Sequence, residues 1–101
     1  MIPPECQIGA ITYDILRNDF LLEKMNRSGY INSREQKIRV AHREVSQEFL
    51  ILMHEAFHGI SDEQGYELEE GCIHALSTGL TIFLNSLGIE PDFSQIPEEE
   101  L

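Results

Sequence analysis

The sequence predicts a small α+β domain, in which strands in the first part of the chain precede two helices. Two segments, 8–16 and 37–40, alternate apolar and polar residues, which is typical of half-buried strands. Two later segments, 44–59 and 67–87, repeat apolar residues at helical spacing. A chain of 101 residues suffices for one domain with a modest core. We therefore assign residues 1–101 to a single domain.

The first 41 residues are expected to supply the sheet. Residues 1–7 are predicted to be an irregular lead-in, and residues 8–16 a single strand, because β-branched and apolar side chains alternate with Thr12 and Asp14. Residues 17–26 fit either a continuation of the sheet or a short helical connection. Residues 29–41 have the pattern of a hairpin, and its second arm should direct Ile38 and Val40 into the core.

The first long helix is predicted from about residue 44 or 46 to about Gly59. Its most apolar stripe comprises Val45, Phe49, Leu52, Met53, Ala56 and Ile60. Because its other faces also carry apolar side chains, this helix should be central and mostly buried. Gly59 is expected to end it, and the polar segment 61–65 to turn the chain back.

The second helix is predicted from about Glu67 to about Leu87, with Gly88 as its stop. Its apolar side is expected to consist of Cys72, Ile73, Leu76, Leu80, Phe83, Leu84 and Leu87. Its polar side is expected to consist of Glu70, His74, Ser77, Thr78, Thr81 and Asn85. The acidic tail, 88–101, contains two prolines and is expected to be loosely held.

The charge of the chain excludes some classes of partner. A formal net charge of −11 without a basic cluster argues against binding to nucleic acid or to an anionic membrane surface. The sequence has neither an apolar run of about 18 residues nor a signal segment, so a cytoplasmic protein is expected. Cys6 and Cys72 form no metal-binding pair and are expected to be reduced thiols, although a disulfide between them stays possible. The oligomeric state is left open.

The main chemical motif is His54-Glu55-Ala56-Phe57-His58, which has the pattern HExxH. Residues four apart on a helix lie about 40° apart around its axis, so both imidazoles point to one side and can share one metal ion. Zn²⁺ suits two nitrogen ligands and one oxygen ligand with a fourth position for water. Glu55 is then placed to take the proton of that water. The motif predicts a metal-dependent hydrolase.

A third ligand is expected from the second helix. A short turn lays the two helices antiparallel, which brings Glu70 to the level of His58 and His74 to the level of His54. Glu70 is the preferred oxygen ligand. His74 is the expected partner of a ligand ring, and a site in which His74 itself binds the metal stays open.

These stretches resemble a known family. The segments 52–60, 68–70 and 76–80, preceded by 8–13 and by the hairpin, are similar to small phage-encoded zincin-like metallopeptidases of the ImmA/IrrE group and to other minimal gluzincins. The resemblance implies a minimal zincin-like fold, in which a twisted antiparallel sheet packs on an active-site helix beside a second antiparallel helix. It also implies bound Zn²⁺, with His54, His58 and Glu70 as ligands and Glu55 as general base. Relatives commonly carry an acidic residue where this chain has His74.

The expected function is hydrolysis of peptide bonds in a peptide or protein substrate, by water activated jointly by zinc and Glu55. An edge strand of the hairpin is expected to hold the substrate by strand addition. Tyr66 is a candidate partner for the oxyanion. Two alternatives remain: a non-catalytic zinc-binding module, such as a phage regulatory or interaction protein, and a metal-free acidic helical adaptor.

Overall fold

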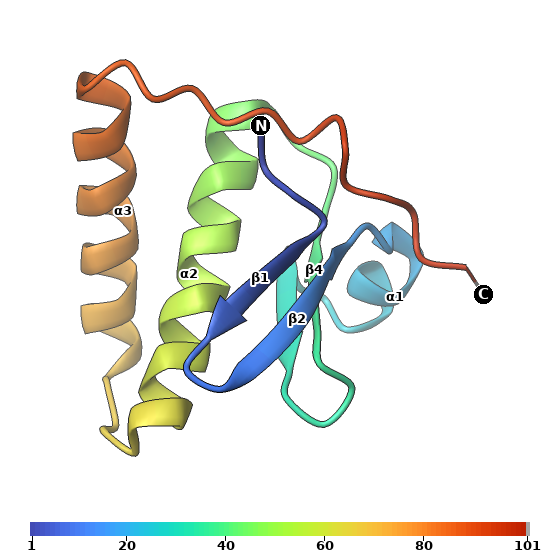
Figure 1. Ribbon diagram of the computed structural model, residues 1–101, viewed down its shortest axis with the longest axis horizontal. Helices are drawn as coiled ribbons and strands as arrows, with labels where there is room; N and C mark the ends of the chain where they lie inside the picture. Colours follow the sequence, from blue (N-terminus) through green and yellow to red (C-terminus); the bar gives the residue numbers. More distant parts are fainter. Residues whose placement is uncertain (101) are drawn as a thin grey trace.

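The computed structural model describes residues 1–100 and contains a four-stranded sheet, two long helices and one short helix (Figure 1). In chain order the elements are β1 (Glu5–Ile8), β2 (Ile11–Leu16), α1 (Asp19–Lys24), β3 (Gly29–Asn32), β4 (Lys37–Val40), α2 (Val45–Gln64) and α3 (Glu70–Ser86). One face of the sheet packs against α2, and α3 lies on the far side of α2 from the sheet. The predicted α+β class is confirmed.

The sheet is mixed, so the expectation of an antiparallel sheet is wrong in one pairing. The strand order is β1-β2-β4-β3, in which β1–β2 and β3–β4 are antiparallel and β2–β4 is parallel. The parallel pair, with Ile15 opposite Ile38, arises because the chain leaves β2 through α1 and β3 before β4 returns beside β2. Strands β1 and β3 are therefore the two edges of the sheet.

The predicted strand 8–16 is confirmed over Ile11–Leu16, which is β2, but the chain turns at residues 9–10 and Ile8 belongs to the preceding strand. Strand β1 begins at Glu5, inside the predicted lead-in, and the chain reverses after Ile8. Gly9 has φ +60°, a left-handed conformation that glycine adopts without steric cost. The ambiguous segment that follows is helical from Asp19, and the Asn18 side chain caps this helix by accepting from the Leu21 amide at 3.0 Å.

The core lies between the sheet and α2. Ile38 and Val40 are fully buried, as predicted, and pack with Tyr13 and Ile15 of β2. Helix α2 contributes Phe49 and Leu52 to the same cluster, whereas Val45 and Ile60 of the predicted stripe are 48% and 41% exposed. The central position predicted for this helix is thus confirmed, but the prediction that it is mostly buried is wrong, because only Glu48, Phe49, Leu52, Glu55 and Gly59 are buried.

Helix α2 continues through Gly59, which was predicted to end it. A Cβ at this glycine would lie 2.7 Å from Ile31 Cδ1 and 2.9 Å from Ile8 Cδ1. Gly59 is therefore a packing residue, which lets the helix approach both edge strands closely. The helix ends at Gln64, and Gly65, with a φ of +64°, forms the left-handed cap.

Helix α3 packs through a face that only partly overlaps the predicted apolar side, since Ile73 is buried as predicted but Ser77 and Thr81 of the predicted polar side are buried with it. Its buried residues are Ile73, Ser77 and Thr81, whereas Leu76 and Phe83 of the predicted apolar side are 44% and 57% exposed. The two hydroxyls can be buried because Ser77 Oγ donates to the Ile73 carbonyl and Thr81 Oγ1 to the Ser77 carbonyl, each at 2.7 Å. The helix also begins at Glu70, three residues later than predicted.

The tail is held against the body of the protein, so the prediction of a loose segment is wrong. It runs from the end of α3 across the start of α2 towards α1 (Figure 1). Phe93 and Ile96 join the core, and the Asp92 carbonyl accepts from the Ile2 amide at 2.8 Å. Glu99 pairs with Arg39 on the sheet face opposite α2. Leu101 lies outside the described residues.

Two further expectations concern the whole described chain. Between residues 1 and 100, no helix combines the length and the apolar character that crossing a bilayer requires. Cys6, which is partly buried, and Cys72, which is exposed, are both free thiols.

Candidate metal centre

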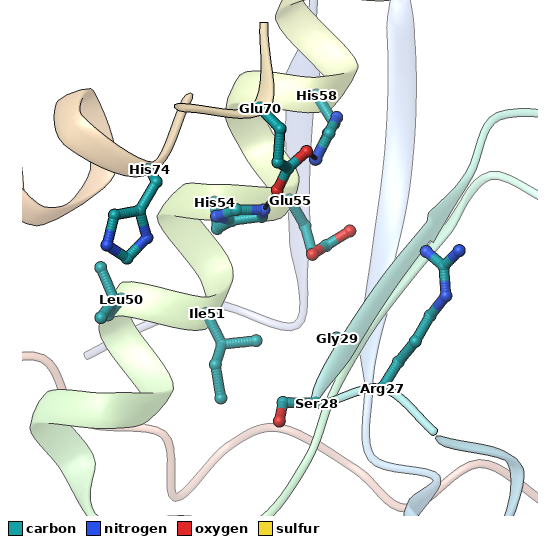
Figure 2. Close-up of a pocket in the computed structure, with 10 residues that line it drawn as sticks. All are labelled: Arg27, Ser28, Gly29, Leu50, Ile51, His54, Glu55, His58, Glu70 and His74. Carbon is teal, nitrogen blue, oxygen red and sulfur yellow. Dashed lines mark ion pairs between the residues drawn. The ribbon is translucent and has the colours of Figure 1, made fainter. Parts of the chain in front are cut away.

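The two histidines of the HExxH motif lie one turn apart on α2 and face the same side. Their ring centroids are 5.0 Å apart, with the ring planes inclined at 59°. Both side chains are partly buried, at 24% and 35% exposure. Each directs its Nε2 atom away from the sheet, towards the start of α3 (Figure 2).

Glu70 meets both rings because the turn between the helices is fixed by Ser61. The Ser61 hydroxyl donates to the Tyr66 carbonyl at 2.6 Å and accepts from the Leu68 amide at 3.1 Å. The chain then enters α3 with Glu70 as its first residue. One Glu70 oxygen lies 2.7 Å from His54 Nε2, and the other lies 3.1 Å from His58 Nε2 (Figure 2).

These three side chains can hold a metal ion. One ligand atom from each of His54, His58 and Glu70 lies within 4.8 Å of the other two. Two imidazole nitrogens and one carboxylate oxygen form a donor set typical of catalytic zinc sites with three protein ligands. The side chain of Glu70 is 67% exposed, so a fourth position is accessible from solvent.

Glu55 lies beside this cluster on the side of the sheet. It is 8% exposed, and burial raises the pKa of its carboxyl, an effect opposed by the nearby His54, His58 and Arg27. A Cβ at Gly29 of β3 would lie 3.1 Å from Glu55 Cγ. The bare backbone at the start of this edge strand therefore gives the carboxylate its space.

All of these groups open into one cavity of about 580 Å³. It is lined by Arg27, Ser28, Gly29, Leu50, Ile51, His54, Glu55, His58, Glu70 and His74 (Figure 2). The cavity thus joins the metal-binding cluster, a buried carboxylate and the start of edge strand β3. It is an arrangement suited to hydrolysis of a bound carbonyl compound.

Two residues singled out in the sequence lie outside the cluster. His74 lines the cavity, but its ring projects on the side of Leu50 (Figure 2), and within residues 1–100 it makes no hydrogen bond to a ligand ring. Tyr66 is 71% exposed and does not line the cavity. The structure therefore brings together His54, Glu55, His58 and Glu70, and leaves these two aside.

One functional candidate, Arg27, was missed in the sequence. It lies in the segment between α1 and β3, and its guanidinium reaches along the cavity opposite Glu55 (Figure 2). The only local signal was a basic residue two positions before a glycine at the start of a predicted strand. Its approach to Glu55 depends on the packing of β3 against α2.

Comparison of the chain with protein-family models, with curated proteins and with solved structures finds no match. The resemblance to zincin-like metallopeptidases therefore rests on the motif and on the segments quoted above.

Proposed function

We propose that this protein is a zinc-dependent metallopeptidase acting on peptides or proteins. The observation that carries the proposal is the convergence of His54, His58 and Glu70, from two helices, next to the buried carboxylate of Glu55. A zincin-like architecture, a cytoplasmic location and a phage-type regulatory setting are part of the same proposal, on the strength of the resemblance alone.

Zinc, when bound by His54, His58 and Glu70, supplies Lewis-acid polarisation of the substrate carbonyl and lowers the pKa of a coordinated water. Glu55 accepts the proton of the attacking water and later donates it to the leaving nitrogen. Its burial supports this role, because burial raises the pKa of the Glu55 carboxyl and so makes it a stronger base than an exposed glutamate.

The edge strand β3 offers a docking site for an extended substrate. The Ala41 amide donates to the Ser28 carbonyl at 2.9 Å, which fixes the pairing of this strand with β4. In an antiparallel ladder the bonded residues alternate, so the backbone groups of Gly29 and Ile31 face the free edge. A peptide added there would pass the carboxylate of Glu55.

The alternative function is a non-catalytic zinc-binding module, regulatory or interacting in role. One observation favours it: α3 exposes two large apolar side chains, Leu76 and Phe83, which lie seven residues apart and so share one side of the helix. Such a surface is more typical of a protein that binds a partner than of an isolated enzyme.

Peptide cleavage separates the two functions. Zinc-loaded protein and its Glu55→Gln variant are incubated with a peptide mixture, and products are identified by mass spectrometry. We expect cleavage by the wild type and a loss of at least about 100-fold in the variant, since general-base catalysis contributes roughly 10²–10⁴-fold. Both proteins should hold one zinc per chain by elemental analysis.

The matched control is Glu23→Gln, which makes the same change on the exposed surface of α1. Equal cleavage by the wild type and Glu55→Gln, or none by the wild type with zinc bound, would contradict the peptidase proposal. Absence of zinc after loading and desalting would instead support a metal-free adaptor.

A further inference from the structure

We propose that Arg27 is a catalytic residue that binds the oxyanion formed at the substrate carbonyl. This inference rests on the proposed peptidase function and adds to it the electrophilic group that the HExxH motif lacks. Tyr66, the candidate from the sequence, does not line the cavity, whereas Arg27 does.

The position of Arg27 carries the proposal. Its side chain extends from the segment before β3 into the same cavity as the metal-binding cluster, and its tip faces the Glu55 carboxylate across the cavity (Figure 2). The guanidinium carbon lies 5.7 Å from the centroid of the Tyr30 ring, a contact that helps to hold the side chain over β3. In this view the Glu55 carboxylate lies between the guanidinium and the metal ligands, so a substrate carbonyl held beside Glu55 on the side of β3 would face Arg27 (Figure 2).

The charge of Arg27 is available for a ligand. Among residues 1–100 it is the only lysine or arginine that lines the cavity, and the chain has a net charge of −11. Within residues 1–100 its guanidinium forms neither a salt bridge nor a hydrogen bond. By contrast, Arg17 and Arg39 are bound to buried or partly buried carboxylates. Arg27 is thus the one cavity-lining cation with unused donors.

The chemistry needs such a group. When the water oxygen forms a bond to the carbonyl carbon, the π-electron pair of the carbonyl moves onto its oxygen, and the proton of the water passes to Glu55. The resulting negative oxygen gains from a guanidinium donor in a partly enclosed cavity. That electron pair then re-forms the carbonyl as the C–N bond breaks, and the proton on Glu55 moves to the leaving nitrogen.

Kinetics of variants test the role. For the peptide cleaved fastest from the mixture, Arg27→Gln should lower kcat by roughly 100- to 1,000-fold, the usual loss on removing one oxyanion donor. KM and the zinc content should stay near the wild-type values, because the contact forms only as charge develops. Arg27→Lys should retain part of the lost rate, since it keeps the charge without the fork of donors. Arg43→Gln, a matched change on an exposed arginine, should behave as the wild type.

A second measurement does not depend on turnover. Methylphosphonate, a tetrahedral anion without a peptide sequence, is titrated calorimetrically into the zinc-loaded wild type and variants. We expect binding by the wild type and by Arg43→Gln, and affinity at least about 10-fold weaker in Arg27→Gln, as for loss of a charge-assisted hydrogen bond. Weakened binding would support an anion site at Arg27 even if no peptide were cleaved, in which case the peptidase proposal alone would fail.

Three results would overturn the inference. The first is an unchanged kcat in Arg27→Gln, and the second is equal methylphosphonate affinity in that variant and the wild type. The third is a rise in KM confined to peptides with a free C-terminal carboxylate, which would assign Arg27 to that carboxylate instead of the oxyanion. Peptides with amidated C-termini provide the comparison.

Discussion

Glu55 and Glu70 are two carboxylates of one cavity in different surroundings. Glu55 is 8% exposed beside β3, whereas the side chain of Glu70 is 67% exposed at the start of α3. The exposed Glu70 carboxylate lies between the two imidazoles and is open to a cation from solvent, which suits a ligand. A buried carboxylate with a raised pKa suits proton transfer. The difference in exposure between the two carboxylates therefore fits the role of metal ligand for Glu70 and of general base for Glu55.

Replacing Glu70 tests the ligand assignment. Glu70→Ala should weaken zinc binding by well over 100-fold, because it removes one of three protein ligands, while loss of an outer partner typically costs roughly 10–100-fold. Glu69→Ala is the matched control: it removes a neighbouring exposed carboxylate and should leave zinc affinity unchanged. His74→Ala should also have little effect, since its ring lies outside the cluster. Affinities are measured by competition with a chromogenic chelator.

The opposite result for the Glu70 and His74 variants would overturn the ligand assignment. If His74→Ala abolished zinc binding while Glu70→Ala preserved it, the third ligand would be a histidine and the gluzincin interpretation would fail.

Helices α2 and α3 place glycines in opposite environments. A Cβ at Gly59 of α2 would lie less than 3 Å from side-chain atoms of Ile31 and Ile8. A Cβ at Gly79 of α3 would meet nothing within 4 Å. Helix propensity favours alanine over glycine by roughly 0.8–1.0 kcal/mol at both positions. At Gly59, packing and not helix propensity should decide whether alanine raises or lowers the free energy of unfolding.

The paired substitutions make this a test of how closely α2 approaches the sheet. Gly79→Ala should raise the free energy of unfolding by up to about 1 kcal/mol. Gly59→Ala should lower it by up to about 2 kcal/mol net, because overpacking typically costs about 1–3 kcal/mol and the gain in helix propensity offsets part of that cost. Chemical denaturation monitored by circular dichroism measures both. Equal stabilisation by the two substitutions would mean that Ile31 and Ile8 move aside for the new methyl group without loss of stability.

The elements differ in how far the sequence predicts them. The HExxH motif lies within one helix, so the shared face of His54 and His58 follows from helical geometry. The position of Glu70 beside His58 follows from the short segment that connects the two antiparallel helices. The orientation of α3 could not be predicted from hydrophobicity, because Ser77 and Thr81 satisfy their hydroxyls within the helix and so pack against α2. Arg27 and the parallel β2–β4 pair depend on contacts between distant segments.

At the scale of the whole molecule, the tail supplies a carboxylate, Glu99, that pairs with the buried Arg39 of β4. Arg39 is 3% exposed, and Glu99 binds it through two hydrogen bonds of 2.7 and 2.9 Å while also contacting Lys37 and Asn18. These contacts, Arg39 first among them, lower the pKa of Glu99 to about 2 and raise that of Arg39. A buried cation of the sheet thus depends on a residue of the tail.

The lowered pKa of Glu99 predicts an acid-sensitive component of stability. A carboxyl whose folded pKa is about 2 and whose ordinary value is near 4.5 stabilises the fold above pH 4.5, and this contribution is lost as the pH falls towards 2. Glu99→Gln should therefore destabilise the protein at pH 7 and flatten the decline in its free energy of unfolding between these pH values.

The size of this effect should be about half of the roughly 3–5 kcal/mol typical for breaking a buried ion pair, because Glu35 still binds Arg39 in the variant. Glu98→Gln is the control, since the side chain of Glu98 is 67% exposed and, within residues 1–100, pairs with His42 and not with Arg39. An identical pH profile for Glu99→Gln and the wild type would refute the role assigned to the tail.

The pairing of Arg39 with Glu99 also has a consequence for the order of events during protein synthesis. The two residues are 60 positions apart, so β4 leaves the ribosome long before its anionic partner exists. Until then, burial of Arg39 is opposed by the cost of desolvating a cation that only Glu35 can offset. The helical hairpin of α2 and α3 needs no such partner and can form on the nascent chain. The sheet should therefore reach its final state only after residue 99 has been translated.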